Sequence, residues 1–241
     1  MQKKMIEGEL MPYFINKISS NSKSDAVVFL GGELLDKDNP CEFARNSNLF
    51  VCADKGAEHA MQLGLIPHAI IGDLDSVSSE TLKYFAERNC KIIRNPDQES
   101  NDFEKILTYL LEMFESEGSS SSVFVFGMTG GRTDHTLANF SVMLRYTDHF
   151  ENITAFEPGA EHRFLTTAKN NCKLEYEIGT TISLTPFGEA NGIVTENLRY
   201  SLSNETLRLG VREGLSNLST GSPVKISIDS GALLVSAIHN S

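Results

Sequence analysis

Short apolar runs alternate with amphipathic segments between residues 26 and 156. Each run is followed by glycine or polar residues, which is typical of buried parallel strands. The segments between them carry apolar residues at helical spacing, as in 106–114. Strands are expected at 26–30, 49–53, 69–71, 91–93, 123–126 and 153–156. This alternation predicts an α/β domain at 25–157, with a Rossmann-like parallel sheet and flanking helices.

The pattern changes after Pro158-Gly159, where short runs alternate in twos and no long amphipathic helix follows. Asn191-Gly192 and Ser203-Asn204 are typical of hairpin turns. A C-terminal all-β domain at 158–241, a β-sandwich of jelly-roll-like type, is therefore expected. Residues 1–24 show no clear period and form an N-terminal lead-in. Expected strands lie at 163–165, 173–176, 181–186, 192–195, 199–202, 206–209, 224–228 and 232–238.

Charge and cysteine content limit the partners and the cellular location that are expected for this protein. The 241 residues include 32 acidic and 21 basic ones, a net charge of -11, which argues against nucleic acid as a partner. The four cysteines form no C-x-x-C pair, as expected in a reducing compartment. No apolar run approaches the roughly 20 residues needed to span a bilayer. A cytoplasmic protein without membrane contact is expected.

Polar residues follow successive strands of the predicted sheet. Because the carboxyl ends of parallel strands share one edge, these side chains should converge where α/β sheets bind ligands. The i, i+2 spacing of Asp73 and Asp75 predicts extended backbone with both side chains on one side. Oxygen-only ligands favour Mg²⁺ over zinc. The residues concerned are Asp54, Asp73, Asp75, Gln98, Asp102, Arg132 and Asp134.

Each of these residues also has a structural interpretation. Aspartate after a strand often forms an Asx turn, and aspartate in a first helical turn complements the helix dipole. For one residue alone the structural interpretation is the more common one. Structural aspartates would occur at both edges of a sheet, however, so their placement at one edge favours a ligand site.

Gly130 and Gly131 precede a predicted helix and leave backbone N–H groups free to meet an anion. Arg132 offers a guanidinium fork for phosphate oxygens. Neither G-x-G-x-x-G nor G-x-x-x-x-G-K-[ST] occurs, so the dinucleotide and P-loop fingerprints do not apply. His135 is expected on the helix surface rather than as an acid–base partner of Asp134.

Five motifs together resemble the thiamine pyrophosphokinase family, over residues 26–238. The resemblance implies transfer of a pyrophosphoryl group from ATP to thiamine, giving thiamine diphosphate and AMP. It also implies a nucleotide-binding catalytic domain at 25–157, a thiamine-binding domain at 158–241, and a homodimer with sites between subunits. The motifs are Ala-Asp-Lys-Gly-Ala at 53–57, Ile-Gly-Asp-Leu-Asp-Ser at 71–76, Pro-Asp-Gln at 96–98 with Asn-Asp at 101–102, Gly-Gly-Arg-Thr-Asp-His-Thr at 130–136, and Gly-Leu-Ser-Asn at 214–217.

The resemblance also assigns roles to individual residues. Asp54, Asp73, Asp75 and Asp102 would form the acidic Mg²⁺-ATP cluster, with the last three at the reacting groups. Gln98 would lie beside thiamine, and Ser216 and Asn217 would reach thiamine from the partner subunit. The nucleotide side would comprise Asp54, Gly130, Gly131, Arg132 and Asp134. The acceptor of the thiamine hydroxyl proton is open between Asp75 and Asp102.

Some positions depart from the family pattern, and none of them removes a carboxylate. Lys55 and Glu58 stand where the family usually has Gly and Asn, and Asn101 replaces Thr. Ser219 stands where some members carry an aromatic residue over thiamine. Two other functions fit the same acidic cluster: a Mg²⁺-dependent nucleotide phosphohydrolase, and a nucleotide- or thiamine-binding module without catalysis.

Overall fold

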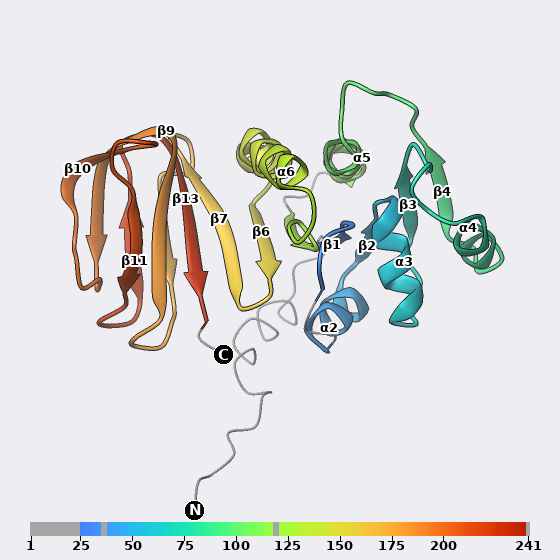
Figure 1. The fold of residues 1–241 in the computed structure, drawn as a ribbon, viewed down its shortest axis with the longest axis horizontal. Coiled ribbons are helices and arrows are strands. Elements are labelled where there is room, and N and C mark those ends of the chain that lie inside the picture. The colour runs from blue at the N-terminus through green and yellow to red at the C-terminus, as the bar shows by residue number, and fades with distance from the viewer. Residues whose placement is uncertain (1–24, 35–37, 118–120, 240–241) are drawn as a thin grey trace, which may run out of the picture. The chain divides into compact units, whose positions relative to one another are not determined.

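The computed structural model describes residues 25–34, 38–117 and 121–239, so the expected lead-in at 1–24 lies outside the described residues. The chain divides into two compact units, Met1–Gly127 and Met128–Ser241 (Figure 1). In the part of the chain that is described, no helix is long and apolar enough to cross a bilayer.

The first unit is built on a five-stranded parallel sheet. The strand order is β4-β3-β2-β1-β5, and each neighbouring pair is parallel. The predicted parallel sheet is therefore confirmed for five of the six expected strands, with strand ends within one residue of those expected. The sixth strand, expected at 153–156, lies in the second unit and pairs antiparallel with the strand that follows it. The strands are β1 (Ala26–Phe29), β2 (Leu49–Cys52), β3 (Ala69–Gly72), β4 (Lys91–Arg94) and β5 (Ser122–Phe126).

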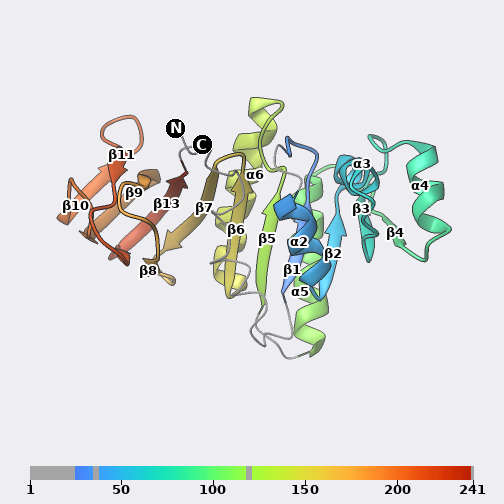
Figure 2. The same ribbon diagram turned by 90° about the horizontal axis from the view of Figure 1, so that it is seen from below.

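Helices cover both faces of this sheet. The helices are α2 (Asp38–Asn46), α3 (Asp54–Gln62), α4 (Ser79–Ala86) and α5 (Asp102–Glu117). Figure 2 shows α2 and α3 on one face and α5 on the other. This arrangement explains why β1 is buried along its whole length, as its unbroken apolar sequence requires. Aromatic rings fill the space beneath the helices, with Phe29 in edge-on contact with Phe50 at 4.7 Å between ring centroids.

Helix α3 lies unusually close to the sheet. A Cβ atom on Gly56 would lie 2.0 Å from the carbonyl oxygen of Phe29, so only glycine allows this approach. The first turn of α3 is thereby held against the carboxyl ends of the central strands. The loops after β2, β3 and β4 open at this same edge.

The second unit contains helix α6 and eight strands. Its strands pair antiparallel, and the predicted β-rich C-terminal part is confirmed. Strand β6 turns back at Pro158-Gly159 to pair with β7. The elements are α6 (Thr133–Tyr146), η1 (Thr147–His149), β6 (Asn152–Glu157), β7 (Ala160–Thr166), β8 (Asn171–Leu174), β9 (Thr181–Glu196), β10 (Ser203–Arg208), β11 (Gly214–Leu218), β12 (Val224–Ser227) and β13 (Ser230–Ile238).

Strand β9 connects the strands of this unit. Its first part pairs with β13 and β11, and its last part pairs with β12 and β10. The sequence predicted two separate strands, at 181–186 and 192–195, and this expectation is wrong. The two predicted segments are parts of one 16-residue strand.

Two predicted hairpin turns are also wrong. Gly192 and Asn204 have positive φ angles of 66° and 59°, as turn residues do. Both residues nevertheless lie inside paired strands, where the register between β9 and β10 shifts. They form β-bulges, which require the same left-handed backbone as a turn. Residues 199–202, expected as a strand, form the connection from β9 to β10, whereas strand β11 was not predicted.

Candidate active site

Asp54 is the first residue of α3, and its carboxylate is buried with 1% of the residue's surface exposed. Its Oδ2 atom accepts a hydrogen bond from the backbone N–H of Ser76 at 3.3 Å. Its Oδ1 atom is buried and has no hydrogen-bond partner among the described residues. A buried carboxylate oxygen without a donor is unfavourable unless a cation binds it. Asp54 therefore indicates a cation site at the carboxyl edge of the sheet.

Gly72, the last residue of β3, makes room for this carboxylate. A Cβ atom at Gly72 would lie 1.9 Å from Asp54 Oδ1 and 3.2 Å from Asp102 Cγ. Two carboxylates from two different helices therefore meet over the end of the strand only because this position lacks a side chain. This steric role of Gly72 was not predicted from the sequence.

The expected extended backbone at Asp73 and Asp75 is wrong. Leu74 between them has a φ angle of 66°, in the left-handed region. The chain forms an Asx turn in which the backbone N–H of Asp75 donates to Asp73 Oδ1 at 3.2 Å. Asp75 is exposed, and its Oδ1 accepts a hydrogen bond from the Ser76 hydroxyl at 2.8 Å. The two side chains still interact, since a side-chain hydrogen bond with Asp75 helps to lower the pKa of Asp73, but a turn and not extended backbone brings them together.

Asp102 begins helix α5, which Asn101 caps. The side chain of Asn101 accepts a hydrogen bond from the backbone N–H of Glu104 at 2.9 Å. Asp102 Oδ1 lies 3.3 Å from Nζ of Lys105, whose side chain is buried. Lys105 was not identified from the sequence, although its i+3 spacing from Asp102 was a usable signal.

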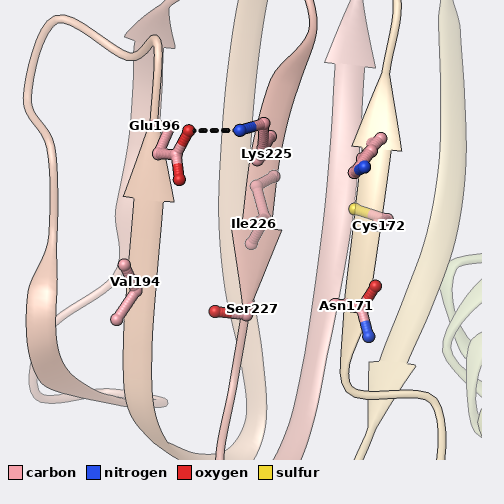
Figure 3. Close-up of a pocket in the computed structure, with 8 residues that line it drawn as sticks. Asn171, Cys172, Val194, Glu196, Lys225, Ile226 and Ser227 are labelled. Atoms are coloured by element: carbon pink, nitrogen blue, oxygen red, sulfur yellow. Dashed lines mark hydrogen bonds and ion pairs between the residues drawn. The ribbon is translucent and has the colours of Figure 1, made fainter.

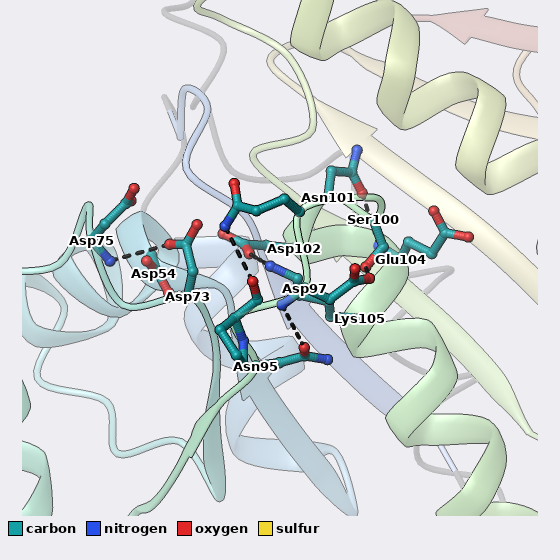
Figure 4. A network of polar contacts seen from close by, with 12 residues as sticks. Asp54, Asp73, Asp75, Asn95, Asp97, Ser100, Asn101, Asp102, Glu104 and Lys105 are labelled. Atoms are coloured by element: carbon teal, nitrogen blue, oxygen red, sulfur yellow. Dashed lines mark hydrogen bonds and ion pairs between the residues drawn. The ribbon is translucent and has the colours of Figure 1, made fainter.

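Three of the four predicted acidic residues come together. Asp54, Asp73 and Asp102 each offer an oxygen, and these oxygens all lie within 4.8 Å of one another. Figure 4 shows the three side chains facing a common space, with Asp75 at its margin. Asp75 is not in the group of three. The segments that follow β2, β3 and β4 thus supply one carboxylate each, two of them from the first residue of a helix.

Burial and mutual repulsion shift the pKa values of this cluster. Burial is the main cause that raises the pKa of Asp54 to about 6, and the negative charge of Asp102 contributes to the same shift. Burial also raises the pKa of Asp102, against the opposing effect of Lys105. The pKa of Asp73 is lowered, mainly by the hydrogen bond from the backbone of Asp75. Acidic groups crowded in this way favour a cation between them.

The cluster fits a magnesium ion by its chemistry. All three donors are carboxylate oxygens, which suit a hard cation and not zinc or copper. The unpartnered Oδ1 of Asp54 is the atom that most needs such a ligand. Mg²⁺ usually binds only one or two protein carboxylates and takes its other ligands from water and substrate phosphates. The three carboxylates of the cluster are therefore enough to hold one Mg²⁺ ion.

Gln98 lies in the exposed loop after β4. Its Nε2 donates to the carbonyl oxygen of Pro96 at 3.3 Å, and a hydrogen bond from its side chain helps to lower the pKa of Asp73. It therefore lies beside the acidic cluster. The same unit holds Asp54, Asp73, Asp75, Gln98 and Asp102, five of the predicted site residues.

The other predicted site residues belong to the second unit. Arg132 is the N-cap of α6 and is exposed, and its Nε lies 3.1 Å from Asp134 Oδ1. Asp134 has its pKa lowered to about 2 by the hydrogen bond from Arg132. Gly130 has a φ angle of 82°, and a Cβ atom on Gly131 would meet no atom within 4 Å. This loop is thus open toward solvent at the first turn of a helix.

Ser216 and Asn217 lie on strand β11. Ser216 is exposed with a φ angle of 56°, and its backbone N–H donates to the Ser183 hydroxyl at 3.0 Å. Asn217 is buried, and its side chain binds Tyr200 at both backbone groups: Oδ1 accepts from the N–H at 3.0 Å, and Nδ2 donates to the carbonyl at 2.7 Å. Asn217 therefore holds the loop between β9 and β10 in place. This contact was not predicted from the sequence.

A shallow pocket in the second unit is formed by β8, β9 and β12 (Figure 3). Lys225 pairs with Glu196 at 2.6 Å, and Cys172 and Asn171 lie along the same surface. None of the predicted site residues lines it. Lys173 also lines the pocket, so its two lysines and one glutamate leave one net positive charge.

Comparisons with known proteins match both parts of the chain. The family described as thiamin pyrophosphokinase, catalytic domain, matches residues 41–156, and thiamin pyrophosphokinase, vitamin B1 binding domain, matches residues 170–233. The chain is 25% identical over 231 residues to thiamin pyrophosphokinase 1 of Caenorhabditis elegans, covering 93% of each chain. It is 25% identical over 203 residues to thiamine pyrophosphokinase of Bacillus subtilis, covering 78% of this chain and 86% of that one.

Solved structures share the fold. The thiamine pyrophosphokinase structure from Bacillus subtilis aligns with a TM-score of 0.76 at 20% identity, over 90% of this chain and all of the other. The yeast thiamin pyrophosphokinase structure aligns with a TM-score of 0.77 at 18% identity, over 92% of this chain and 89% of the other. At these identities the structural likeness concerns the fold alone.

Proposed function

Because the chain belongs to the thiamin pyrophosphokinase family, we propose that it transfers the pyrophosphoryl group of ATP to the hydroxyl of thiamine, giving thiamine diphosphate and AMP. The observation that carries this proposal is the convergence of Asp54, Asp73 and Asp102 at one edge of the sheet. These residues come from the motifs that resemble the family's nucleotide site. The convergence supplies carboxylate oxygens that could hold a Mg²⁺ ion facing a triphosphate.

In this mechanism Asp54, Asp73 and Asp102 would hold the metal ion. When bound, Mg²⁺ would neutralise negative charge on the phosphates as the reaction proceeds. The thiamine hydroxyl oxygen attacks the β-phosphorus, the bond from that phosphorus to the α–β bridging oxygen breaks, and AMP leaves. Catalysis by the chain itself consists mainly of positioning and charge complementarity.

Arg132 would bind phosphate oxygens through its guanidinium fork, in exchange for its contact with Asp134. Gly130 and Gly131 would leave backbone N–H groups beside it for the same anion. The hydroxyl proton passes to a carboxylate, with Asp75 and Asp102 as the two candidates. The exposure of Asp75 and the contact of Asp102 with Lys105 are compatible with either assignment.

Thiamine would lie near Gln98, with Ser216 and Asn217 contributed by a partner subunit. We therefore propose a homodimer, in which residues 25–157 act on the nucleotide and residues 158–241 bind thiamine. Large apolar side chains exposed on the second unit, including Tyr200, Val211 and Leu215, support an interface there. The four free cysteines support a cytoplasmic location.

One assay tests the activity. The protein is incubated with Mg-ATP with and without thiamine, and AMP, ADP and thiamine diphosphate are separated and quantified. Thiamine-dependent AMP together with an equal amount of thiamine diphosphate is the expected result. Release of AMP or ADP without thiamine would instead support a nucleotide phosphohydrolase, and binding without turnover would support a non-catalytic module.

A further inference from the structure

Glu58 lies one helical turn after Asp54 on α3, and both side chains reach the same loop. This loop, residues 73–78, follows strand β3 and carries Asp73. Asp54 accepts the backbone N–H of Ser76 at 3.3 Å, and Glu58 Oε1 accepts the backbone N–H of Ser78 at 2.9 Å. Residues at i and i+4 lie on the same side of a helix, so α3 holds the loop at two neighbouring amides.

The second oxygen of Glu58 extends this attachment into helix α4. Glu58 Oε2 accepts a hydrogen bond from the Thr81 hydroxyl at 2.8 Å, and Thr81 is buried. Ser78, the N-cap of α4, accepts the backbone N–H of Thr81 at 3.0 Å through its hydroxyl. Glu58 therefore binds both the first residue outside α4 and a residue in its first turn.

The hydrogen bonds that Asp54 and Glu58 accept from the loop differ in their relation to the proposed metal ion. Asp54 is itself a member of the acidic cluster, so a bound cation would contact the same carboxylate that holds the loop. Glu58 is outside that cluster and makes its contacts without a metal. Between the two amides, Val77 is buried and fixes the middle of the loop. The end of the loop thus has an anchor that does not depend on the metal.

We propose that Glu58 is a positioning residue, which holds loop 73–78 so that Asp73 meets Asp54 and Asp102 before a metal ion arrives. This inference rests on the proposed metal site. A loop already in place loses little conformational freedom on binding, so Glu58 should increase the affinity of the cluster for Mg²⁺. It should have little effect on turnover once the metal is bound.

The test compares Glu58→Ala, Glu58→Gln and a matched control, Glu80→Ala, which removes an exposed glutamate from the first turn of α4. Glutamine can accept the Ser78 N–H and donate to the Thr81 hydroxyl, so it should retain the anchor. Hydrogen exchange of the Ser76–Ser78 amides is measured in metal-free protein. Mg²⁺ affinity is measured by calorimetry, and turnover is measured across Mg²⁺ concentrations.

For Glu58→Ala we expect amide exchange in the loop to accelerate, and the Mg²⁺ dissociation constant to rise about 10-fold. Turnover at saturating Mg²⁺ should stay close to that of the unchanged protein, and Glu58→Gln should recover both properties. Loop exchange and Mg²⁺ affinity equal to those of Glu80→Ala would overturn the proposal. So would a loss of thermal stability alone, because that indicates a merely structural role.

The exchange measurement also separates two kinds of failure. If the unchanged protein does not bind Mg²⁺, the proposed metal site is wrong. The anchor is still tested in that case, because faster loop exchange in Glu58→Ala but not in Glu58→Gln reports the hydrogen bonds directly. Equal exchange in all variants would refute the anchor whatever the metal result.

Discussion

At the scale of single residues, the acidic cluster depends on a missing side chain. Gly72 leaves the space in which the Asp54 carboxylate lies, and a Cβ atom there would come within 1.9 Å of Oδ1. Gly72→Ala should therefore displace Asp54 from the cluster. We expect Mg²⁺ affinity to fall at least about 10-fold and turnover about 100-fold. Calorimetry and the AMP assay measure the two effects.

A double variant provides the control for this steric argument. Asp54→Ala removes the group with which the new methyl would collide. In Gly72→Ala/Asp54→Ala the free energy of unfolding should therefore recover relative to Gly72→Ala, whereas activity should not. Strictly additive destabilisation in urea unfolding would show that the two residues do not interact.

The raised pKa of Asp54 makes metal binding depend on pH. With a pKa of about 6 in the metal-free protein, the carboxyl group increasingly holds a proton below pH 6, which the cation must displace. We expect Mg²⁺ affinity to decrease below pH 6, approaching about 10-fold per pH unit where one proton is released. Titration calorimetry from pH 5 to 8 measures it. Asp54→Asn should bind weakly with a flatter profile.

The same shift affects stability with a definite sign. Between pH 3.8 and about 6 the folded metal-free protein keeps a proton on Asp54 that the unfolded chain has lost. The contribution of Asp54 to the free energy of unfolding must therefore decrease as pH rises through this window. Urea unfolding with a chelator, compared with Asp54→Asn, isolates this contribution. An Asp54 contribution that grows with pH would contradict the raised pKa.

At the scale of elements, the parallel strands were predictable because each is a short, continuously apolar run buried on both faces. The C-terminal strands were harder to delimit. Asn191-Gly192 and Ser203-Asn204 supply residues that tolerate left-handed backbone, but turns and bulges require the same backbone. Only the pairing partner decides between them, and the sequence does not state it. The long strand β9 was therefore divided in two.

The loop between β9 and β10 shows a buried polar contact that the sequence did not reveal. Asn217 satisfies both backbone groups of Tyr200 and also accepts the N–H of Leu218 at 2.9 Å. Asn217→Ala leaves these groups without their partner. It should lower the free energy of unfolding by about 2–4 kcal/mol, measured by urea unfolding.

Ser216→Ala is the matched control on the same strand. Ser216 is exposed, and its backbone hydrogen bond does not require its side chain. This variant should keep the stability of the unchanged protein and raise the KM for thiamine if its hydroxyl binds the substrate. If Asn217→Ala changes stability but not KM, its role is to hold the loop rather than to contact thiamine.

At the scale of the whole molecule, the acidic residues of the cluster and their shared edge could be predicted from the sequence. The backbone that positions them could not. The carboxyl ends of neighbouring parallel strands must share an edge, and this rule placed Asp54, Asp73 and Asp102 together. Asp75 was included through an assumed extended backbone, and the left-handed Leu74 carries no sequence signal, since leucine rarely adopts it. Glu58 was noted only as a departure from a family pattern, because its partners Ser78 and Thr81 lie 20 and 23 residues away.

The proposed homodimer makes a prediction about two inactive variants. Asp73→Asn removes a metal ligand and should lower turnover at least about 100-fold, while Ser216→Ala/Asn217→Ala removes the proposed thiamine contacts. If each site combines the acidic cluster of one subunit with the thiamine contacts of its partner, a mixed dimer has one intact site. Random assembly makes half of the dimers mixed, so co-expression should restore about one quarter of the activity.

A second pair of variants controls for this complementation. Asp73→Asn co-expressed with Asp102→Asn damages the acidic cluster of both subunits, so every dimer should remain inactive. Light scattering establishes that dimers form, and two affinity tags isolate the mixed species. Recovery in the first pair alone requires a site shared between subunits, because no intact set of residues exists within either chain. A lack of recovery in isolated mixed dimers would instead place the whole site within one chain.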